Sequence, residues 1–105
     1  MSVLIWPPSD ATLDRIAAKL EPYEQHHPDA EIEIRRRNAV TVWIRVIDPA
    51  FGAVSRADRH DILWDLIESL DEDDLSQISL LLALTPRESN SSAGNLIFDE
   101  PVVSP

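Results

Sequence analysis

The alternation of apolar and polar residues predicts two amphipathic helices. A helix over about residues 10–21 is indicated by apolar residues three and four positions apart, which are Leu13, Ile16, Ala17 and Leu20. Pro22 should end or kink this helix, because proline lacks the amide hydrogen that a helix interior needs. Ser55 can cap a second helix over about residues 56–70, whose apolar stripe consists of Ile62, Leu63, Leu66, Ile67 and Leu70.

Strict alternation with a period of two predicts strands between and after these helices. Residues 31–34 and residues 40–47 alternate in this way, and residues 35–39 are expected to turn between them. The pattern therefore predicts an antiparallel hairpin with three arginines near its tip. Residues 78–84 predict a third strand, since they are apolar, short and followed by Pro86.

The predicted order α-β-β-α-β indicates an α+β fold, in which a three-stranded mixed sheet carries both helices on one face. The acidic run 71–74 is expected to be a loop, because acids at a helix C-terminus oppose the helix dipole. We predict a lead-in over residues 1–9, a single domain over residues 10–88 and a flexible polar tail over residues 89–105.

The composition limits the cellular compartments and the kinds of chemistry that we expect for this protein. The 105 residues carry a net charge of −10, yet residues 35–59 hold six arginines and only two acids. The chain is thus dipolar, and its overall charge repels nucleic acid and anionic membranes. It has no cysteine, which removes disulfides and a self-contained cysteine-ligated cluster. The sequence shows no signal peptide and no membrane span, so we expect a cytoplasmic protein.

Catalytic motifs are missing from the sequence. There are two glycines, Gly52 and Gly94, and neither lies in a phosphate-binding loop. The carboxylates gather in solvated runs, where little would shift a pKa. We therefore expect a protein-binding module that is not an enzyme and has no cofactor of its own.

Aromatic and basic residues supply the candidates for binding. Trp43 falls on the face opposite Val42 and Ile44, which places it on the open side of the sheet, and Trp64 either meets it or lies exposed. Arg35, Arg36 and Arg37 are either phosphate contacts, as in a KH-like nucleic-acid binder, or a solvated hairpin tip.

The stretch from Phe51 to Leu63 resembles the signature of the BolA family, with a loop Phe followed by Arg59-His60 early in a helix. The segment around Leu84-Thr85-Pro86 is similar to the end of that family's third strand. The resemblance covers about residues 10–88 and implies a fold similar to class II KH domains.

BolA-like proteins partner monothiol glutaredoxins in iron–sulfur homeostasis, and some act in regulation. The resemblance implies partner binding through Phe51, Arg56, Arg59 and His60, with His60 as the candidate ligand of a shared iron–sulfur cluster. The family's other ligand positions correspond to Gln77 and to the arginine run. A different interpretation is a small regulatory subunit with an unrelated partner, using residues 96–98 as a docking peptide.

Overall fold

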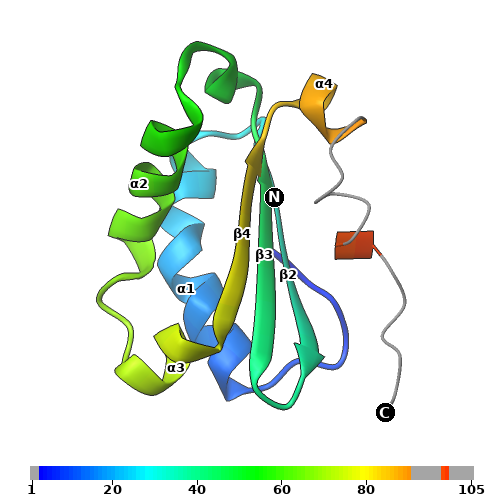
Figure 1. Ribbon diagram of the computed structural model, residues 1–105, viewed down its shortest axis with the longest axis vertical. Coiled ribbons are helices and arrows are strands. Elements are labelled where there is room, and N and C mark those ends of the chain that lie inside the picture. The colour runs from blue at the N-terminus through cyan, green and yellow to red at the C-terminus, as the bar shows by residue number, and fades with distance from the viewer. Residues whose placement is uncertain (1–2, 91–97, 100–105) are drawn as a thin grey trace.

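The computed structural model describes residues 3–90 and 98–99, and within them a mixed sheet carries helices on one face (Figure 1). The α+β architecture predicted from the sequence is confirmed. The sheet has four strands rather than three, in the order β1-β2-β3-β4. In chain order the elements are β1 (Leu4–Ile5), α1 (Ala11–His26), β2 (Glu31–Asn38), β3 (Thr41–Ile47), the 3₁₀ turn η1 (Pro49–Ala53), α2 (Arg56–Ile67), α3 (Glu72–Gln77), β4 (Ile78–Leu84) and α4 (Pro86–Ser89).

The additional strand β1 comes from the predicted lead-in. It pairs parallel with β2, placing Leu4 opposite Glu33 and Ile5 opposite Ile34. The amide of Trp6 continues this ladder with a 2.9 Å hydrogen bond to the carbonyl of Ile34. A two-residue strand has too little alternation to stand out in a sequence, because its pairing is decided by the edge it meets.

The hairpin turn lies later in the chain than predicted. β2 and β3 pair antiparallel, with Ile34 opposite Ile44, and the turn falls at residues 39 and 40. The Asn38 side chain accepts a 2.9 Å hydrogen bond from the amide of Val40, which closes the turn. The three arginines therefore belong to strand β2, and the prediction that residues 35–39 form the turn was wrong.

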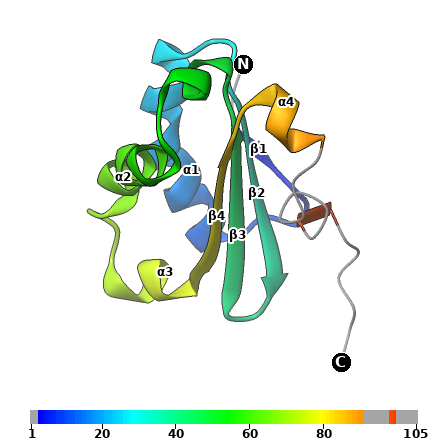
Figure 2. The same cartoon turned by 45° about the horizontal axis from the view of Figure 1, so that its top comes forward.

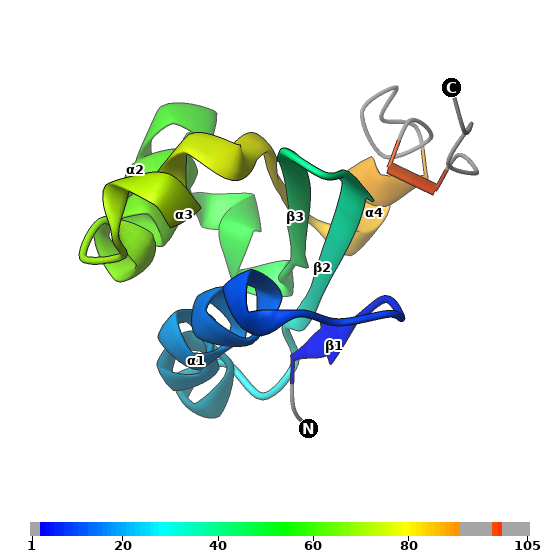
Figure 3. The ribbon, with the colours of Figure 1, turned by 90° about the horizontal axis from the view of Figure 1, so that it is seen from below.

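The core lies between the sheet and α1 and α2. Figures 1 and 3 show these helices together on one side, while α4 and the segment Phe98–Asp99 lie on the other. β3 pairs parallel with β4, and the register shifts between Val42 and Trp43. After this shift, Leu81 and Ala83 pack against the core while Leu80 pairs with Trp43 on the open face. The fully enclosed side chains include Leu13, Ile16, Leu20, Ile34, Ile44, Leu63 and Ile67.

Two helix predictions need correction. α1 continues through Pro22 to His26, because Tyr23 and Glu24 in its last turns are buried against the domain. The acidic run after α2 is not a loop: it opens the separate helix α3, with Glu72, Asp73 and Asp74 in the first turn. Acids at a helix N-terminus are favoured by the helix dipole, whereas the sequence argument had placed them at a C-terminus.

An ion pair joins α3 to α1. The carboxylate of Asp74 is buried and accepts two hydrogen bonds from Arg15, from Nε at 2.6 Å and from Nη2 at 2.8 Å. The hydrogen bonds from Arg15 lower the pKa of Asp74 below its usual value. A buried carboxylate of this kind depends on its cation.

Replacing Arg15 with methionine should lower the free energy of unfolding, because Asp74 stays buried without its charged donor, and the exposure of half of the Arg15 side chain limits the loss. Urea denaturation followed by circular dichroism measures the loss. Lys19→Met is the control, since it removes a positive charge from the same helix and leaves both hydrogen bonds to Asp74 in place. Equal losses in the two variants would show that the ion pair adds nothing specific.

Candidate docking surface on helix α2

The exposed side of α2 carries three residues of different chemistry. Arg56, His60 and Trp64 follow one another at every fourth position, so they share one face of the helix. All three are exposed, and Trp64 retains 39% of its accessible surface. The rings of His60 and Trp64 lie nearly parallel, with centroids 6.5 Å apart and an interplanar angle of 10°. We call Arg56, His60 and Trp64 the α2 stripe.

The start of α2 is held by its cap. The hydroxyl of Ser55 accepts a 3.2 Å hydrogen bond from the amide of Asp58, as the sequence predicted. Figure 2 shows α2 beside α1 on the same face of the sheet. The stripe is therefore presented by a capped helix packed on the core, which is a more rigid support than a loop.

Arg59 points inward instead. Its side chain is 6% exposed, and its guanidinium donates to the carbonyl of Val54 at 2.9 Å and to the carbonyl of Ala83 at 3.1 Å. A third hydrogen bond, of 2.6 Å, runs from Nη1 to Oε1 of Glu88. Arg59 thus ties the loop before α2 to the end of β4 and to α4.

Glu88 is positioned to receive Arg59. Its carboxylate accepts from the Thr85 amide at 2.9 Å while the Thr85 hydroxyl accepts from the Glu88 amide at 3.1 Å, a capping box that opens α4. The hydrogen bond from Arg59, followed by the one from the Thr85 amide, lowers the pKa of Glu88 to about 2. Arg56 also approaches this carboxylate, at 3.8 Å, but remains largely exposed.

The four residues that the sequence assigned to partner binding thus lie in two different settings. Arg56 and His60 are on the outer side of α2, whereas Phe51 and Arg59 are 1% and 5% exposed. Phe51 packs in the core, and the Arg59 guanidinium lies 5.6 Å from its ring centroid. Trp64 joins the exposed set, and its four-residue spacing from His60 was the signal that could have placed it there.

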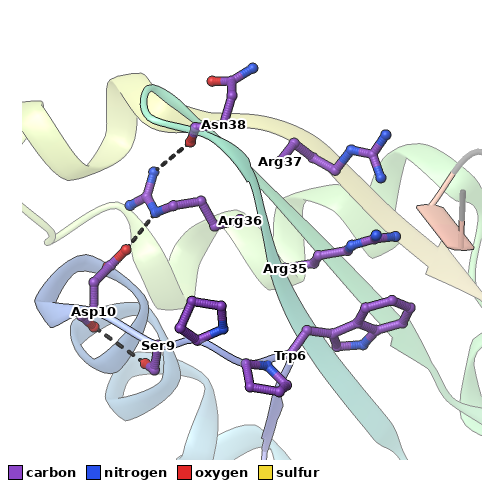
Figure 4. A pocket seen from close by; sticks show the side chains of 9 residues that line it. Trp6, Ser9, Asp10, Arg35, Arg36, Arg37 and Asn38 are labelled. Atoms are coloured by element: carbon purple, nitrogen blue, oxygen red, sulfur yellow. Dashed lines mark hydrogen bonds and ion pairs between the residues drawn. The ribbon is translucent and has the colours of Figure 1, made fainter. Parts of the chain in front are cut away.

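The arginine run is divided between the two faces of the sheet. Arg36 turns to the helix side, where its Nε donates to Asp10 at 2.5 Å and its Nη2 donates to Gln77 at 2.9 Å. Arg35 and Arg37 point the other way, as Figure 4 shows. Arg35 is buried, and Arg37 lies 4.3 Å above the ring of Trp43. Three side chains arranged in this way do not form a common basic tip.

The donor atoms do not suit a metal cluster held by this chain alone. Gln77, where the BolA resemblance expects a histidine, has its amide engaged by Arg36 and by the carbonyl of Asp73. Within residues 3–90 and 98–99, no three or more His, Cys, Asp or Glu side chains gather where they could hold a metal ion. The exposed imidazole of His60 could contribute one ligand and would need the others from elsewhere.

Comparison with known proteins shows what the fold is similar to. No protein-family model matches the sequence, and no curated protein matches it either. Among solved structures, the BolA domain of SufE1 from Arabidopsis thaliana matches with a TM-score of 0.52 and 26% sequence identity. The match covers 76% of this chain and 98% of that one. The fold of this domain is BolA-like.

The resemblance predicted from the Phe51 and Arg59-His60 region is thereby confirmed at the level of the fold. Because the match spans nearly all of the BolA domain but only part of this chain, the chain carries residues beyond the shared BolA-like unit. Among the described residues, no helix has the length and apolar character needed to cross a membrane.

Proposed function

We propose that this BolA-like domain is a non-catalytic module that binds a protein partner through the α2 stripe. The observation that carries the proposal is an exposed Trp64 stacked beside His60, with Arg56 on the same face. Tryptophan and arginine are the residue types that dominate binding energy at protein interfaces.

The support beneath the stripe favours this role. Arg59 and Glu88 connect α2 to the loop before it, to β4 and to α4, so the stripe is fixed before any partner arrives. A helix that is already fixed loses less conformational entropy on binding than a loop that must be ordered, which leaves more of the contact energy as affinity. In this proposal Arg59 and Phe51 position the surface, while Arg56, His60 and Trp64 contact the partner.

We infer a monothiol glutaredoxin-like protein as the partner, following the BolA resemblance. His60 would offer one imidazole to an iron–sulfur cluster that the partner brings. The Gln77 amide is engaged by Arg36 and the sequence has no cysteine, so His60 is the one ligand that we propose from the family's ligand positions. Docking and any sharing of the cluster can therefore be tested separately.

The test is calorimetric titration of a cluster-loaded monothiol glutaredoxin with the wild-type domain and with Trp64→Ala and His60→Ala. Trp64→Ala should weaken binding by about tenfold or more, the effect of losing an interface hot spot. His60→Ala should weaken docking more than it weakens folding and should alter the visible circular dichroism of the complex. Each comparison needs the free energy of unfolding of the same variant.

Ile62→Ala is the matched control, because Ile62 is 40% exposed on α2 but lies off the stripe. It should leave the affinity within about twofold of the wild type. If no complex forms, the glutaredoxin partnership is refuted. If Ile62→Ala and Trp64→Ala weaken binding equally, a complex exists but the α2 stripe is not its contact surface.

The alternative of a nucleic-acid binder has lost the feature that suggested it. It required Arg35, Arg36 and Arg37 to present their charges together at a hairpin tip. Arg35 is buried, and Arg36 is engaged by Asp10 and Gln77 on the other side of the sheet. No observation on the described residues favours this function over protein binding.

A further inference from the structure

The open face of the sheet, opposite α1 and α2, holds an aromatic side chain from the far end of the chain. Phe98 is fully buried there. Its ring meets Trp6 edge-on at 5.7 Å and lies 6.4 Å from the ring of Trp43. The guanidinium of Arg45 covers it at 4.4 Å from the centroid, within the range of a cation–π contact. We call the site formed by Trp6, Arg35, Trp43 and Arg45 the aromatic slot.

Polar contacts fix the orientation of the segment in the slot. Nη1 of Arg35 donates a 2.5 Å hydrogen bond to the main-chain carbonyl of Phe98. Arg45 forms a 3.0 Å ion pair with the carboxylate of Asp99, whose side chain is half exposed. Burial, followed by the nearby charge of Arg37, lowers the pKa of Arg35. A buried cation needs acceptors, and the carbonyl of Phe98 provides one.

The walls of the slot are held by contacts that do not involve Phe98. Glu33 accepts a 3.1 Å hydrogen bond from the indole of Trp6 and a 2.7 Å hydrogen bond from Nε of Arg45. The indole of Trp43 donates to the hydroxyl of Ser79 at 3.0 Å. These partners lie on the sheet itself, so the slot should keep its shape when the Phe98 ring leaves it.

Space continues beyond the slot on the side of Trp6. A cavity of about 580 Å³ lies between residues 6–10 and residues 35–38 (Figure 4). Trp6 and Arg35 line both the cavity and the slot. An extended peptide whose aromatic residue enters the slot would therefore have room for a neighbouring residue.

We propose that the aromatic slot is a peptide-binding site for an aromatic residue followed by an acidic one, and that Phe98–Asp99 of the same chain occupies it until a partner peptide displaces them. The slot contacts one aromatic ring, one main-chain carbonyl and one carboxylate. Any short segment with an aromatic residue followed by an acidic one supplies these three groups. Arg35, Arg37 and Arg45 outnumber Glu33 around it, which attracts an acidic segment to this face of a chain of net charge −10.

Occupation of the slot by Phe98 of the same chain lowers the apparent affinity of the slot for a partner peptide. A tethered segment acts at an effective concentration of roughly millimolar, so it masks the slot from weak competitors. Removing the Phe98 ring should therefore expose the slot and raise its apparent affinity for an added peptide. The proposal concerns a different surface from the α2 stripe and stands or falls independently of it.

The experiment measures fluorescence anisotropy of a labelled synthetic peptide with the sequence of residues 95–103, titrated with the full-length chain. Phe98→Ala protein should bind it about tenfold more tightly than wild-type protein. The same peptide with alanine in place of Phe98 should not bind. A Gly/Ser peptide carrying a single Phe-Asp pair should show the same preference for the Phe98→Ala protein.

Asp99→Ala is the second variant, because it removes only the half-exposed partner of Arg45 and leaves the ring in place; it should strengthen peptide binding by about two- to threefold. Val40→Ala, a change at a residue that is 71% exposed in the hairpin turn, is the control and should behave as wild type. Equal affinities of wild type, Phe98→Ala and Asp99→Ala for the peptide, or no binding to folded Phe98→Ala protein, would overturn the proposal. A concentration-dependent dimer of the wild type that Phe98→Ala abolishes would overturn it in favour of tail exchange between two copies.

Discussion

Replacing Arg59 with leucine is expected to lower the free energy of unfolding by about 3 kcal/mol near neutral pH, the range seen when one partner of a buried ion pair is removed. The substitution leaves Glu88 without its 2.6 Å donor and leaves the carbonyls of Val54 and Ala83 without theirs. The Arg59 guanidinium contacts the loop before α2, the end of β4 and α4, and leucine cannot donate a hydrogen bond to any of them. Urea denaturation followed by circular dichroism gives the value.

Arg56→Leu is the matched control for this prediction. Arg56 approaches the same carboxylate from the same helix, but at 3.8 Å and with 79% of its side chain exposed. An exposed ion pair of this kind contributes little, so the change should stay within about 0.5 kcal/mol. If the two arginine variants lose stability equally, burial is not what makes the Arg59–Glu88 pair strong.

The Arg59–Glu88 pair makes the free energy of unfolding depend on pH. The folded pKa of Glu88 is about 2, below the value of 4.5 expected in the unfolded chain. Its contribution is therefore complete above about pH 4.5 and is lost as the pH falls toward about 2. Glu88→Gln should be less stable than wild type near neutral pH, and the gap between them should narrow over that window. A gap that stays constant with pH would contradict this assignment.

Replacing Tyr23 with phenylalanine should cost about 2 kcal/mol, because it leaves the buried carboxylate of Asp48 without the hydroxyl that donates to it. Asp48 also caps η1 by accepting a 2.9 Å hydrogen bond from the amide of Ala50. Burial, and then the hydrogen bond to Asp48, raise the pKa of Tyr23. The folded state therefore resists ionising this phenol, and stability should fall as the pH rises above about 10.

A double-mutant cycle with Asp48→Asn checks the Tyr23 prediction. If the two side chains act through their hydrogen bond, the double variant should lose less stability than the sum of the single variants. The alkaline loss of stability should also shrink in Tyr23→Phe, which has no phenol at this position. Additive losses would show that the two residues stabilise the domain separately.

Periodicity in the sequence was enough for the main elements of this BolA-like domain. The stripes of α1 and α2 and the alternation of β2, β3 and β4 each repeat often enough to stand above chance. β1 has two residues, and it exists because β2 offers a free edge. The acids of α3 were predicted to be a loop because the same residues oppose the dipole after one helix and favour it before the next.

The candidate sites were harder to predict, because each depends on contacts between distant residues. Nothing local in Arg59-His60 says that the first residue points inward to Glu88 while the second stays exposed. The sequence predicted a five-residue turn with Arg35 at a solvated tip. The turn has two residues, so Arg35 lies at a buried position in strand β2. The tail was predicted to be flexible over residues 89–105; most of it lies outside the described residues, but Phe98 packs on the sheet.

The strand order has a consequence for how these molecules behave at high concentration. Among the described residues, β4 is the last strand in the sheet, seven residues long and without a charged side chain, and such an edge is a template onto which another chain could add. Such an edge favours aggregation unless molecules are kept apart. The net charge of −10 supplies that separation by mutual repulsion. We therefore expect colloidal stability to be greatest in dilute salt and to fall as the pH approaches the isoelectric point of about 4.5.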